Sequence, residues 1–284
     1  MTVQFERAVI VGTGLLGASL AVAVRRAGIV RHVVGVGRSR ANLEVALAAG
    51  RVDAVSQDPL AAVADADLVV IATPVDTAVD LLAGLVVAAP PRALFTDVGS
   101  VKTGIVVAAE RAGIATRFVG GHPIAGGTAT GAAAADPELF FGKTVVLTPS
   151  PETTREARDA IHGLWVAVGA LVVEMSPSRH DALLALTSQL PQLAAFALAA
   201  TLETAGDVPM ALVGRGFRDT TRLASSDHDM WSAIVRVNRD EILGAMDAFA
   251  LTWTRLRAAV ERNDEAALRA VMAEARRLRE RFDR

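Results

Sequence analysis

Residues 8–28 read AVIVGTGLLGASLAVAVRRAG and combine a short apolar strand, a glycine-rich turn and a helical segment. The turn at residues 12–17 matches the pattern G-x-G-x-x-G, and the run VVGV at residues 33–36 supplies a second strand. In this setting the first glycine makes a tight turn, the second lets the backbone approach a pyrophosphate, and the third allows close helix packing. The pattern predicts a dinucleotide-binding unit, whose expected cofactor contacts are Gly12, Gly14, Leu15, Leu16 and Gly17.

The residues that discriminate between the two nicotinamide dinucleotides should lie about 20 positions beyond the glycines, at the end of the second strand. Arg38, Ser39 and Arg40 stand there, without a carboxylate to bind a ribose 2′-hydroxyl. Guanidinium groups suit a 2′-phosphate, so NADP is favoured over NAD. Alternatively, both arginines are solvated loop residues and the site accepts either cofactor. A later strand end adds three candidate cofactor contacts, Thr73, Pro74 and Val75.

Strand-like and helix-like segments alternate over the first 176 residues. The expected strands are Ala8–Val11, His32–Val36, Leu68–Thr73, Ala93–Asp97, Phe118–Gly120, Thr144–Thr148 and Leu171–Met175. Most of them are continuously apolar, which is typical of strands covered on both faces. We therefore predict that residues 1–176 form an α/β Rossmann-like domain with a mostly parallel, doubly wound sheet.

The second part of the chain, residues 177–284, contains no convincing strand and is rich in Ala and Leu. It predicts an all-α domain, in which Thr254–Arg281 has the spacing of one amphipathic helix. The uncharged stretch Ala182–Leu202 is long enough to span a bilayer. However, polar side chains and a proline crowd its middle, between residues 187 and 192, so a helix of a soluble domain is the better prediction.

The overall composition indicates a globular enzyme that acts on small molecules. The 284 residues carry a net charge of −2 and are 52% hydrophobic, which gives no reason to expect nucleic acid or a membrane as a partner. The absence of cysteine excludes disulfides and cysteine-ligated metals, and we predict no metal site. The N-terminus lacks the pattern of a secretory signal, so a cytoplasmic location is expected.

His122 is the best candidate for a general base. It follows an apolar strand and is flanked by glycines and a proline in the segment FVGGHPIAG, which exposes it at the sheet edge. A histidine in that position can accept a proton at neutral pH. The remaining histidines, His32, His162 and His228, are interpreted as structural, and His180 beside Asp181 as a helix-start pair.

Several motifs, taken together, resemble the prephenate and arogenate dehydrogenases of tyrosine biosynthesis. They are GTGLLGASL, DLVVIATPV, TDVGSVK, FVGGHPIAG, ELFFGKTVVLTPS, HDALLALTSQLPQ, GRGFRDTTRLASSDHDMW and the asparagine of VNRDEIL, in order from residue 12 to residue 238. The resemblance implies oxidative decarboxylation of a cyclohexadienol, with hydride transfer to the nicotinamide and aromatisation of the ring. It also implies that the helical domain forms a homodimer.

The same resemblance assigns roles to individual residues. His122 matches the family histidine that accepts the proton of the carbinol hydroxyl. Ser100 matches a serine that helps to orient that histidine, the hydroxyl and the cofactor. Arg222 matches the arginine that clamps a substrate carboxylate, and Arg218 is a second candidate; a guanidinium suits this task because it binds carboxylates bidentately.

The chain departs from the family where many relatives have Ser-His-Leu-Pro-His. It has Ser188, Gln189, Leu190, Pro191 and Gln192 instead. Amides still form hydrogen bonds with a carboxylate or an amino group, but they carry no charge. These positions are expected to contact the substrate side chain. Glutamine in place of the second histidine resembles the pattern of arogenate-using relatives, which favours arogenate over prephenate. A third candidate substrate is 4-amino-4-deoxyprephenate.

Two alternatives of other kinds remain. A β-hydroxyacid dehydrogenase or a pyrroline-carboxylate reductase would share the architecture, but the helices from Asp181 to Val237 contain no lysine to serve as the base of the lysine-dependent type. A non-catalytic protein that senses NADP would need the glycine turn, but not His122, Ser100 and Arg222 together.

Overall fold

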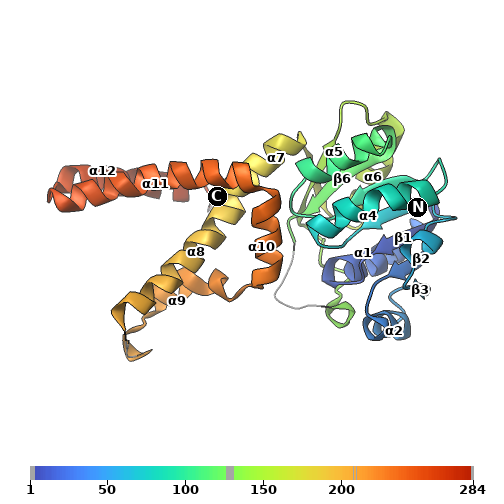
Figure 1. Cartoon of the computed structure of the whole chain (residues 1–284), viewed down its shortest axis with the longest axis horizontal. Helices are drawn as coiled ribbons and strands as arrows, with labels where there is room; N and C mark the ends of the chain where they lie inside the picture. Colours follow the sequence, from blue (N-terminus) through green and yellow to red (C-terminus); the bar gives the residue numbers. More distant parts are fainter. Residues whose placement is uncertain (1–3, 126–130, 207, 209, 283–284) are drawn as a thin grey trace.

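Eight strands form one sheet in the N-terminal half of the molecule, in the order β3-β2-β1-β4-β5-β6-β7-β8 (Figure 1). The computed structural model describes residues 4–125, 131–206, 208 and 210–282. Neighbouring strands are parallel except for β6 and β7. The strands are β1 (Phe5–Val11), β2 (Val30–Val36), β3 (Ala54–Ser56), β4 (Leu68–Ile71), β5 (Leu94–Asp97), β6 (Phe118–Pro123), β7 (Thr144–Pro149) and β8 (Leu171–Glu174).

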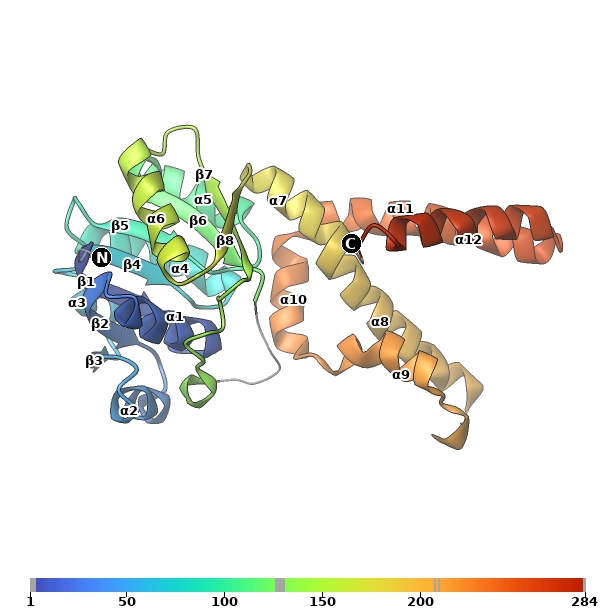
Figure 2. The same ribbon diagram turned by 180° about the vertical axis from the view of Figure 1, so that it is seen from behind.

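Helices cover both faces of this sheet, as the doubly wound prediction required. They are α1 (Leu15–Arg26), α2 (Arg40–Ala48), α3 (Pro59–Ala62), α4 (Val75–Ala88), α5 (Thr103–Arg111) and α6 (Arg155–Ala167). Figure 1 shows α4 and α5 on the near face, and Figure 2 shows α1 and α6 on the other. Strand β3 is missing from the prediction because it has only three residues, none of them buried.

The core lies on both sides of the sheet, which explains the continuous apolar runs. Within β1, Ala8 and Ile10 pack into the cluster that contains α1 and α6, while Val9 and Val11 pack into the cluster of α4 and α5. Side chains alternate across a strand, so each residue of a central strand is buried on one face or the other. The prediction of an interior parallel sheet is therefore confirmed.

The C-terminal part is helical, and α11 and α12 form an arm that points away from the sheet (Figure 2). Its α-helices are α7 (Pro177–Leu184), α8 (Leu190–Ala200), α9 (Arg215–Thr221), α10 (His228–Val237), α11 (Arg239–Glu261) and α12 (Glu265–Arg279). A π-helical turn, Ala185–Gln189, joins α7 to α8. No strand occurs among the described residues of this part, which agrees with the sequence pattern.

The expectation of a single helix over Thr254–Arg281 is wrong, because the chain turns between α11 and α12. Asn263 adopts a positive φ of 52°, a conformation that asparagine tolerates better than most residues. The Asp264 side chain then caps α12 by accepting a hydrogen bond from the Ala267 N–H at 2.9 Å. Helical periodicity continues across this turn, which is why the spacing did not reveal it.

The helical part contacts the sheet domain through α10. Ile234 packs with Val75 and Val101, which precede or begin helices at the carboxyl edge of the sheet. Beside this contact, Arg236 forms an ion pair with Asp76 at 2.6 Å. The junction therefore places α10 over the sheet edge at which open α/β proteins bind their ligands.

A buried ion pair between Asp97 and Lys102 holds the same sheet edge together. Both side chains are almost fully inaccessible to solvent. Lys102 Nζ also donates to the Gly121 carbonyl at 2.9 Å, and Asp97 accepts from the N–H groups of Gly99 at 2.8 Å and Gly121 at 3.1 Å. The pair thus joins the end of β5, strand β6 and the start of α5.

Replacing Lys102 by Met should destabilise the protein strongly, because Asp97 would remain buried without its counter-charge. We expect a loss of about 3–5 kcal/mol in the free energy of unfolding, measured by urea denaturation. Lys143 is exposed, so the matched variant Lys143→Met should change the value by about 0.5 kcal/mol or less. Equal stability of the two variants would contradict this role of the pair.

Candidate active site

The three motif glycines meet different constraints in the structure. Gly12 has a φ of +112°, and a Cβ there would lie 2.4 Å from the Ala72 carbonyl oxygen. A Cβ on Gly17 would lie 1.9 Å from the Gly12 carbonyl oxygen, whereas at Gly14 no atom lies within 4 Å of the Cβ position. The first and third glycines are therefore required by the fold, and the second leaves space for a ligand.

The start of α1 is suited to bind a phosphate. Gly14 is the N-cap residue, no side chain caps the helix, and the first turn contains no acidic residue. The N–H groups of Leu15 and Leu16, at the first two helical positions, therefore remain available to an anion, and the helix dipole favours negative charge there. These features fit the pyrophosphate of a dinucleotide.

Residues 73–75 lie at the adjacent strand end, as predicted. Pro74 precedes α4, whose N-terminus also has no side-chain cap. The Thr73 hydroxyl oxygen is buried and has no hydrogen-bond partner among the described residues, so it is available to a bound ligand. Val75 instead packs into the junction with α10. A ligand at this strand end would therefore meet Thr73 and Pro74, whereas the Val75 side chain is already buried in the junction.

The three polar side chains after β2, at residues 38–40, differ in their partners. Ser39 caps α2 by accepting a hydrogen bond from the Asn42 N–H at 3.3 Å, and Arg40 pairs with Glu44 at 2.9 Å. Arg38 is exposed and forms no ion pair with any residue that the structure describes. Of the two arginines, Arg38 is therefore the more available to an added phosphate.

Asn42 was not identified from the sequence. Its side-chain nitrogen donates to the Thr13 carbonyl at 2.8 Å and to the Thr13 hydroxyl at 3.0 Å, while its oxygen accepts from the Ala132 N–H at 2.8 Å. Asn42 thus holds the glycine turn in place from α2. No local pattern marks such a residue, because its partners are distant in the sequence.

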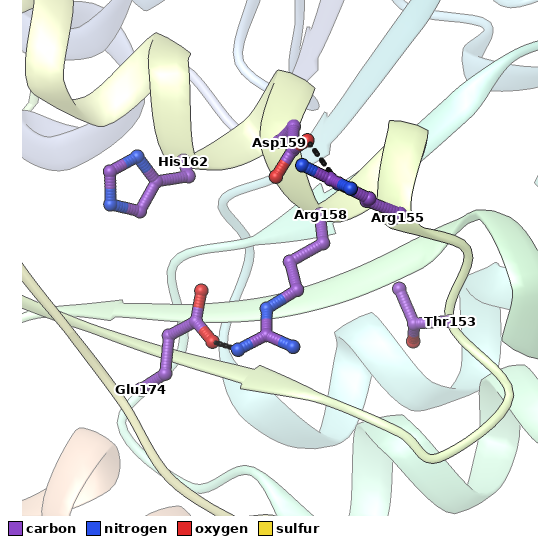
Figure 3. Close-up of a pocket in the computed structure, with 6 residues that line it drawn as sticks. All are labelled: Thr153, Arg155, Arg158, Asp159, His162 and Glu174. Atoms are coloured by element: carbon purple, nitrogen blue, oxygen red, sulfur yellow. Dashed lines mark hydrogen bonds and ion pairs between the residues drawn. The ribbon is translucent and has the colours of Figure 1, made fainter.

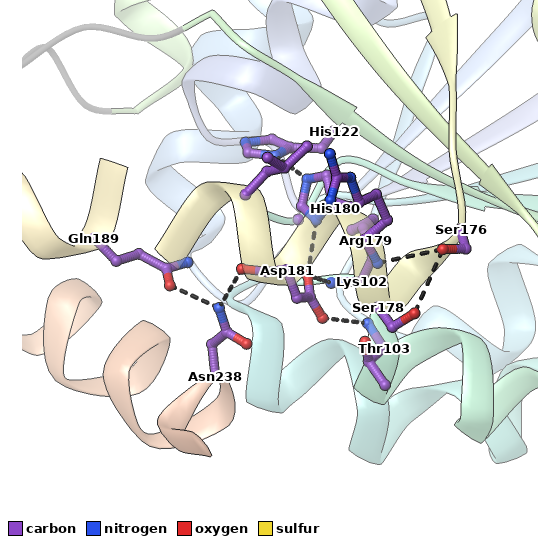
Figure 4. A network of polar contacts seen from close by, with 12 residues as sticks. Lys102, Thr103, His122, Ser176, Ser178, Arg179, His180, Asp181, Gln189 and Asn238 are labelled. Carbon is purple, nitrogen blue, oxygen red and sulfur yellow. Dashed lines mark hydrogen bonds and ion pairs between the residues drawn. The ribbon is translucent and has the colours of Figure 1, made fainter. Parts of the chain in front are cut away.

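The candidate base lies in a chain of polar contacts shown in Figure 4. His122 Nδ1 is 2.8 Å from Nε2 of His180, and His180 Nδ1 is 2.7 Å from Oδ1 of Asp181. The interpretation of His180 and Asp181 as a helix-start pair is wrong, since α7 begins after its N-cap residue Ser176. Both residues lie inside the helix and face the sheet domain.

The Asp181 carboxylate caps a different helix, α5. It accepts hydrogen bonds from the N–H groups of Lys102 at 2.8 Å and Thr103 at 2.7 Å, besides the contact with His180. Burial acts to raise the pKa of Asp181, but these hydrogen bonds outweigh it and the pKa is lowered. Asp181 is therefore an ionised, acceptor-only group.

His122 is neutral under ordinary conditions. Burial lowers its pKa well below the usual histidine value, and His180 and Lys102 lower the pKa further, while Asp181 acts in the opposite direction. Its side chain is nevertheless partly exposed at the end of β6. A neutral imidazole in that position can take up a proton from a ligand.

The other residues expected in the site are spread over both domains. Ser100 is partly buried in the loop between β5 and α5. Arg218 is exposed and donates to the Val213 carbonyl at 3.0 Å, and Arg222 is exposed at the start of the short helix Arg222–Ser225. Neither arginine forms a hydrogen bond with His122 or Ser100 within the described part of the chain.

The two glutamines that stand in place of the family histidines are buried, and both form hydrogen bonds within the helical domain. Gln192 donates to the Leu223 carbonyl at 2.6 Å and so anchors the segment that carries Arg222. Gln189 accepts from the Asn238 amide at 2.7 Å, which leaves its own NH₂ group without a partner among the described residues. Ser188 is partly buried in the π-helical turn, a structure that is frequent at functional sites.

A separate hollow of 510 Å³ lies between α6 and β8 (Figure 3). Its charged side chains are mostly paired with each other, Arg155 with Asp159 and Arg158 with Glu174. It contains none of the residues predicted for the site and is lined by Thr153, Arg155, Arg158, Asp159, His162 and Glu174. This hollow is therefore separate from the sheet edge around His122.

Comparison with known families assigns both parts of the chain. Residues 20–174 match the nucleotide-binding domain of prephenate dehydrogenase, and residues 176–274 match its dimerization domain. The chain belongs to the prephenate dehydrogenase family. The fold and family predicted from the motifs are thus confirmed.

Individual members of the prephenate dehydrogenase family support this assignment. The prephenate dehydrogenase of Bacillus subtilis is 34% identical over 89% of this chain and 70% of its own length. The structure of the Aquifex aeolicus prephenate dehydrogenase with hydroxyphenyl propionate and NAD+ has a TM-score of 0.92 at 30% identity, covering 99% of this chain and 100% of that one. A Synechocystis arogenate dehydrogenase has a TM-score of 0.84 at 28% identity, covering 97% and 99%.

The glycine geometry predicts that Gly14→Ala and Gly17→Ala fail in different ways. The first variant should keep the thermal midpoint of the parent but bind the dinucleotide about tenfold or more weakly, a difference of about 1.4 kcal/mol, measured by calorimetric titration. The second should lower the midpoint or prevent folding, because its methyl group collides with the Gly12 carbonyl. Unchanged dinucleotide affinity in Gly14→Ala would contradict the proposed approach of the pyrophosphate.

Proposed function

We propose that this chain catalyses the family reaction with His122 as its general base, arogenate as its preferred substrate and NADP+ as its preferred cofactor. The family reaction is the NAD(P)-dependent oxidative decarboxylation of prephenate or arogenate in tyrosine biosynthesis. The single observation that carries the role of His122 is its place at the carboxyl end of β6, neutral and partly exposed, with Nδ1 bonded to His180.

The reaction requires little covalent chemistry from the protein. The carbinol hydroxyl must lose a proton as its carbon loses a hydride, and the neutral His122 accepts that proton. A bound nicotinamide dinucleotide supplies the hydride acceptor. Loss of the ring carboxylate makes the ring aromatic and so drives the reaction forward, which leaves the protein mainly to position the substrate. In our proposal Arg222 and Arg218 bind substrate carboxylates and Ser100 orients the hydroxyl.

The preference for arogenate follows from the two glutamines. Arogenate carries an ammonium group and a carboxylate on its side chain, whereas prephenate carries a keto acid. The NH₂ group of Gln189, which has no partner among the described residues, can donate to the side-chain carboxylate. Neither Gln189 nor Gln192 can place a positive charge beside the ammonium group of arogenate, whereas a protonated histidine at the same position would repel it. The two glutamines therefore suit the amino acid side chain better than the histidines of many relatives.

The helical domain is proposed to pair with a second copy of the chain. Apolar side chains remain exposed on α8 and on the arm, among them Leu198 at 40%, Leu251 at 67% and Trp253 at 61%. Among the described residues, Pro177–Ala205 is the one helical region long and apolar enough to cross a membrane, and 22% of its most apolar window is buried. We infer a cytoplasmic homodimer that covers these surfaces, with the domain boundary after residue 176.

The substrate and cofactor assignments are tested by one assay of the purified protein. Prephenate, arogenate and 4-amino-4-deoxyprephenate are each offered with NADP+ and with NAD+, and reduced nicotinamide is followed by absorbance. We expect the highest kcat/KM for arogenate with NADP+. A higher value for prephenate would overturn the substrate preference, and no reduced nicotinamide in any combination would contradict the enzymatic function itself.

His122→Asn should abolish most of the turnover, because asparagine cannot take up the proton. We expect kcat to fall by about 10²- to 10⁴-fold, the usual contribution of general acid–base catalysis, with dinucleotide affinity unchanged. His162 is an exposed histidine of α6, so His162→Asn serves as the control and should keep the parent rate. Full activity of His122→Asn would exclude it as the base.

Arg38→Gln should weaken the use of NADP+ selectively. A hydrogen bond to a charged group is worth about 1.5–3 kcal/mol, so the KM for NADP+ should rise about tenfold or more, while the KM for NAD+ stays constant. Arg40→Gln should have the smaller effect, because the Arg40 guanidinium is already paired with Glu44. Equal effects of Arg38→Gln on both cofactors would contradict binding of the 2′-phosphate.

A further inference from the structure

We propose that His180 and Asp181 are positioning residues that hold His122 in the one tautomer able to act as a base, and that stabilise the proton it takes up. This proposal rests on the role of His122 proposed above. Both residues come from α7 in the helical domain, whereas His122 comes from the sheet. The base is therefore oriented across the junction of the two domains.

The first step of the argument concerns Asp181. Its carboxylate oxygens accept two backbone N–H groups and face Nδ1 of His180 at 2.7 Å. An ionised carboxylate has no proton to donate, so Nδ1 of His180 must carry the hydrogen. In a neutral His180 the other nitrogen, Nε2, is then an acceptor.

The second step concerns the contact between the two imidazoles. His180 is fully buried, so water does not reach its Nε2. The nitrogen 2.8 Å away is Nδ1 of His122, which must therefore donate. A neutral His122 with its hydrogen on Nδ1 has its lone pair on Nε2, the nitrogen that remains available to the substrate. The opposite tautomer would place two lone pairs against each other.

The third step concerns charge. The carboxylate of Asp97 is neutralised by its buried pair with Lys102. Asp181 instead accepts from two backbone N–H groups and from His180, and it forms no ion pair with a lysine or arginine that the structure describes. Asp181 is therefore the negative charge that stabilises a protonated His122, acting through His180, as a carboxylate does in other histidine-based catalytic sites.

The proton balance of the reaction suits such a relay. The carbinol proton moves to Nε2 of His122 while the hydride leaves the carbinol carbon. When the ring carboxylate departs as CO₂, the electron pair of the broken C–C bond moves into the ring and the carbonyl oxygen becomes a phenolate. That oxygen takes the stored proton back from Nε2, so the relay is neutral again at the end of each turnover.

His180→Phe and His180→Gln test the relay. Phenylalanine removes the acceptor, so we expect kcat to fall by about 100-fold, with the KM of the dienol and the dinucleotide affinity within about twofold. A glutamine oxygen can replace Nε2 as acceptor, so His180→Gln should recover at least tenfold of that loss. The thermal midpoint of each variant is measured alongside. A fully active His180→Phe, or a His180→Gln no better than His180→Phe, would overturn the proposal.

The same substitutions on a His122→Asn background separate this proposal from the proposed function. If His180 acts through His122, His180→Phe should lower the residual rate of His122→Asn by less than about twofold. Equal losses in both backgrounds would overturn the relay while leaving His122 as the base. Full activity of the single variant His122→Asn would instead refute the proposed function, and with it the relay.

Discussion

The arrangement of the site depends on the hydrogen bonds that the Asp181 carboxylate accepts from the start of α5. Asp181 lies inside a helix of the C-terminal domain, yet its oxygens complete the N-terminus of α5 in the sheet domain. Unsatisfied N–H groups at a buried helix start are costly, and a carboxylate there also meets the positive end of the helix dipole. The requirement to satisfy those groups brings α7 against the sheet edge, and His180 reaches His122 as a result.

The sheet edge itself is shaped by two kinds of constraint. Backbone collisions leave no alternative to glycine at Gly12 and Gly17, so the turn before α1 is determined by sterics. At the ends of β5 and β6 the constraint is electrostatic, because the buried ion pair of Asp97 and Lys102 joins these two strands. Between them the edge has uncapped helix starts and a neutral histidine, the groups that a phosphate and a proton donor would meet.

Local patterns predicted the features that depend on neighbours in sequence. The glycine turn and the apolar strands could be read directly, and so could the place of His122 at the sheet edge, although its side chain is only partly exposed. The patterns failed where the partner is distant. Nothing local shows that His180 contacts a histidine 58 residues earlier or that Asn42 braces the glycine turn. The break between α11 and α12 was readable in principle, because Asn263 and Asp264 are a favourable helix end and cap. The substrate-binding roles of the arginines and glutamines remain predictions.

The bonds of Asp181 to α5 have a consequence for motion. Only two residues separate the end of β8 from the start of α7, so any hinge there would pull Asp181 away from the N–H groups of α5. Each hydrogen bond to a charged group contributes about 1.5–3 kcal/mol, and an opened form would lose two of them at once. Domain opening at this hinge should therefore be rare.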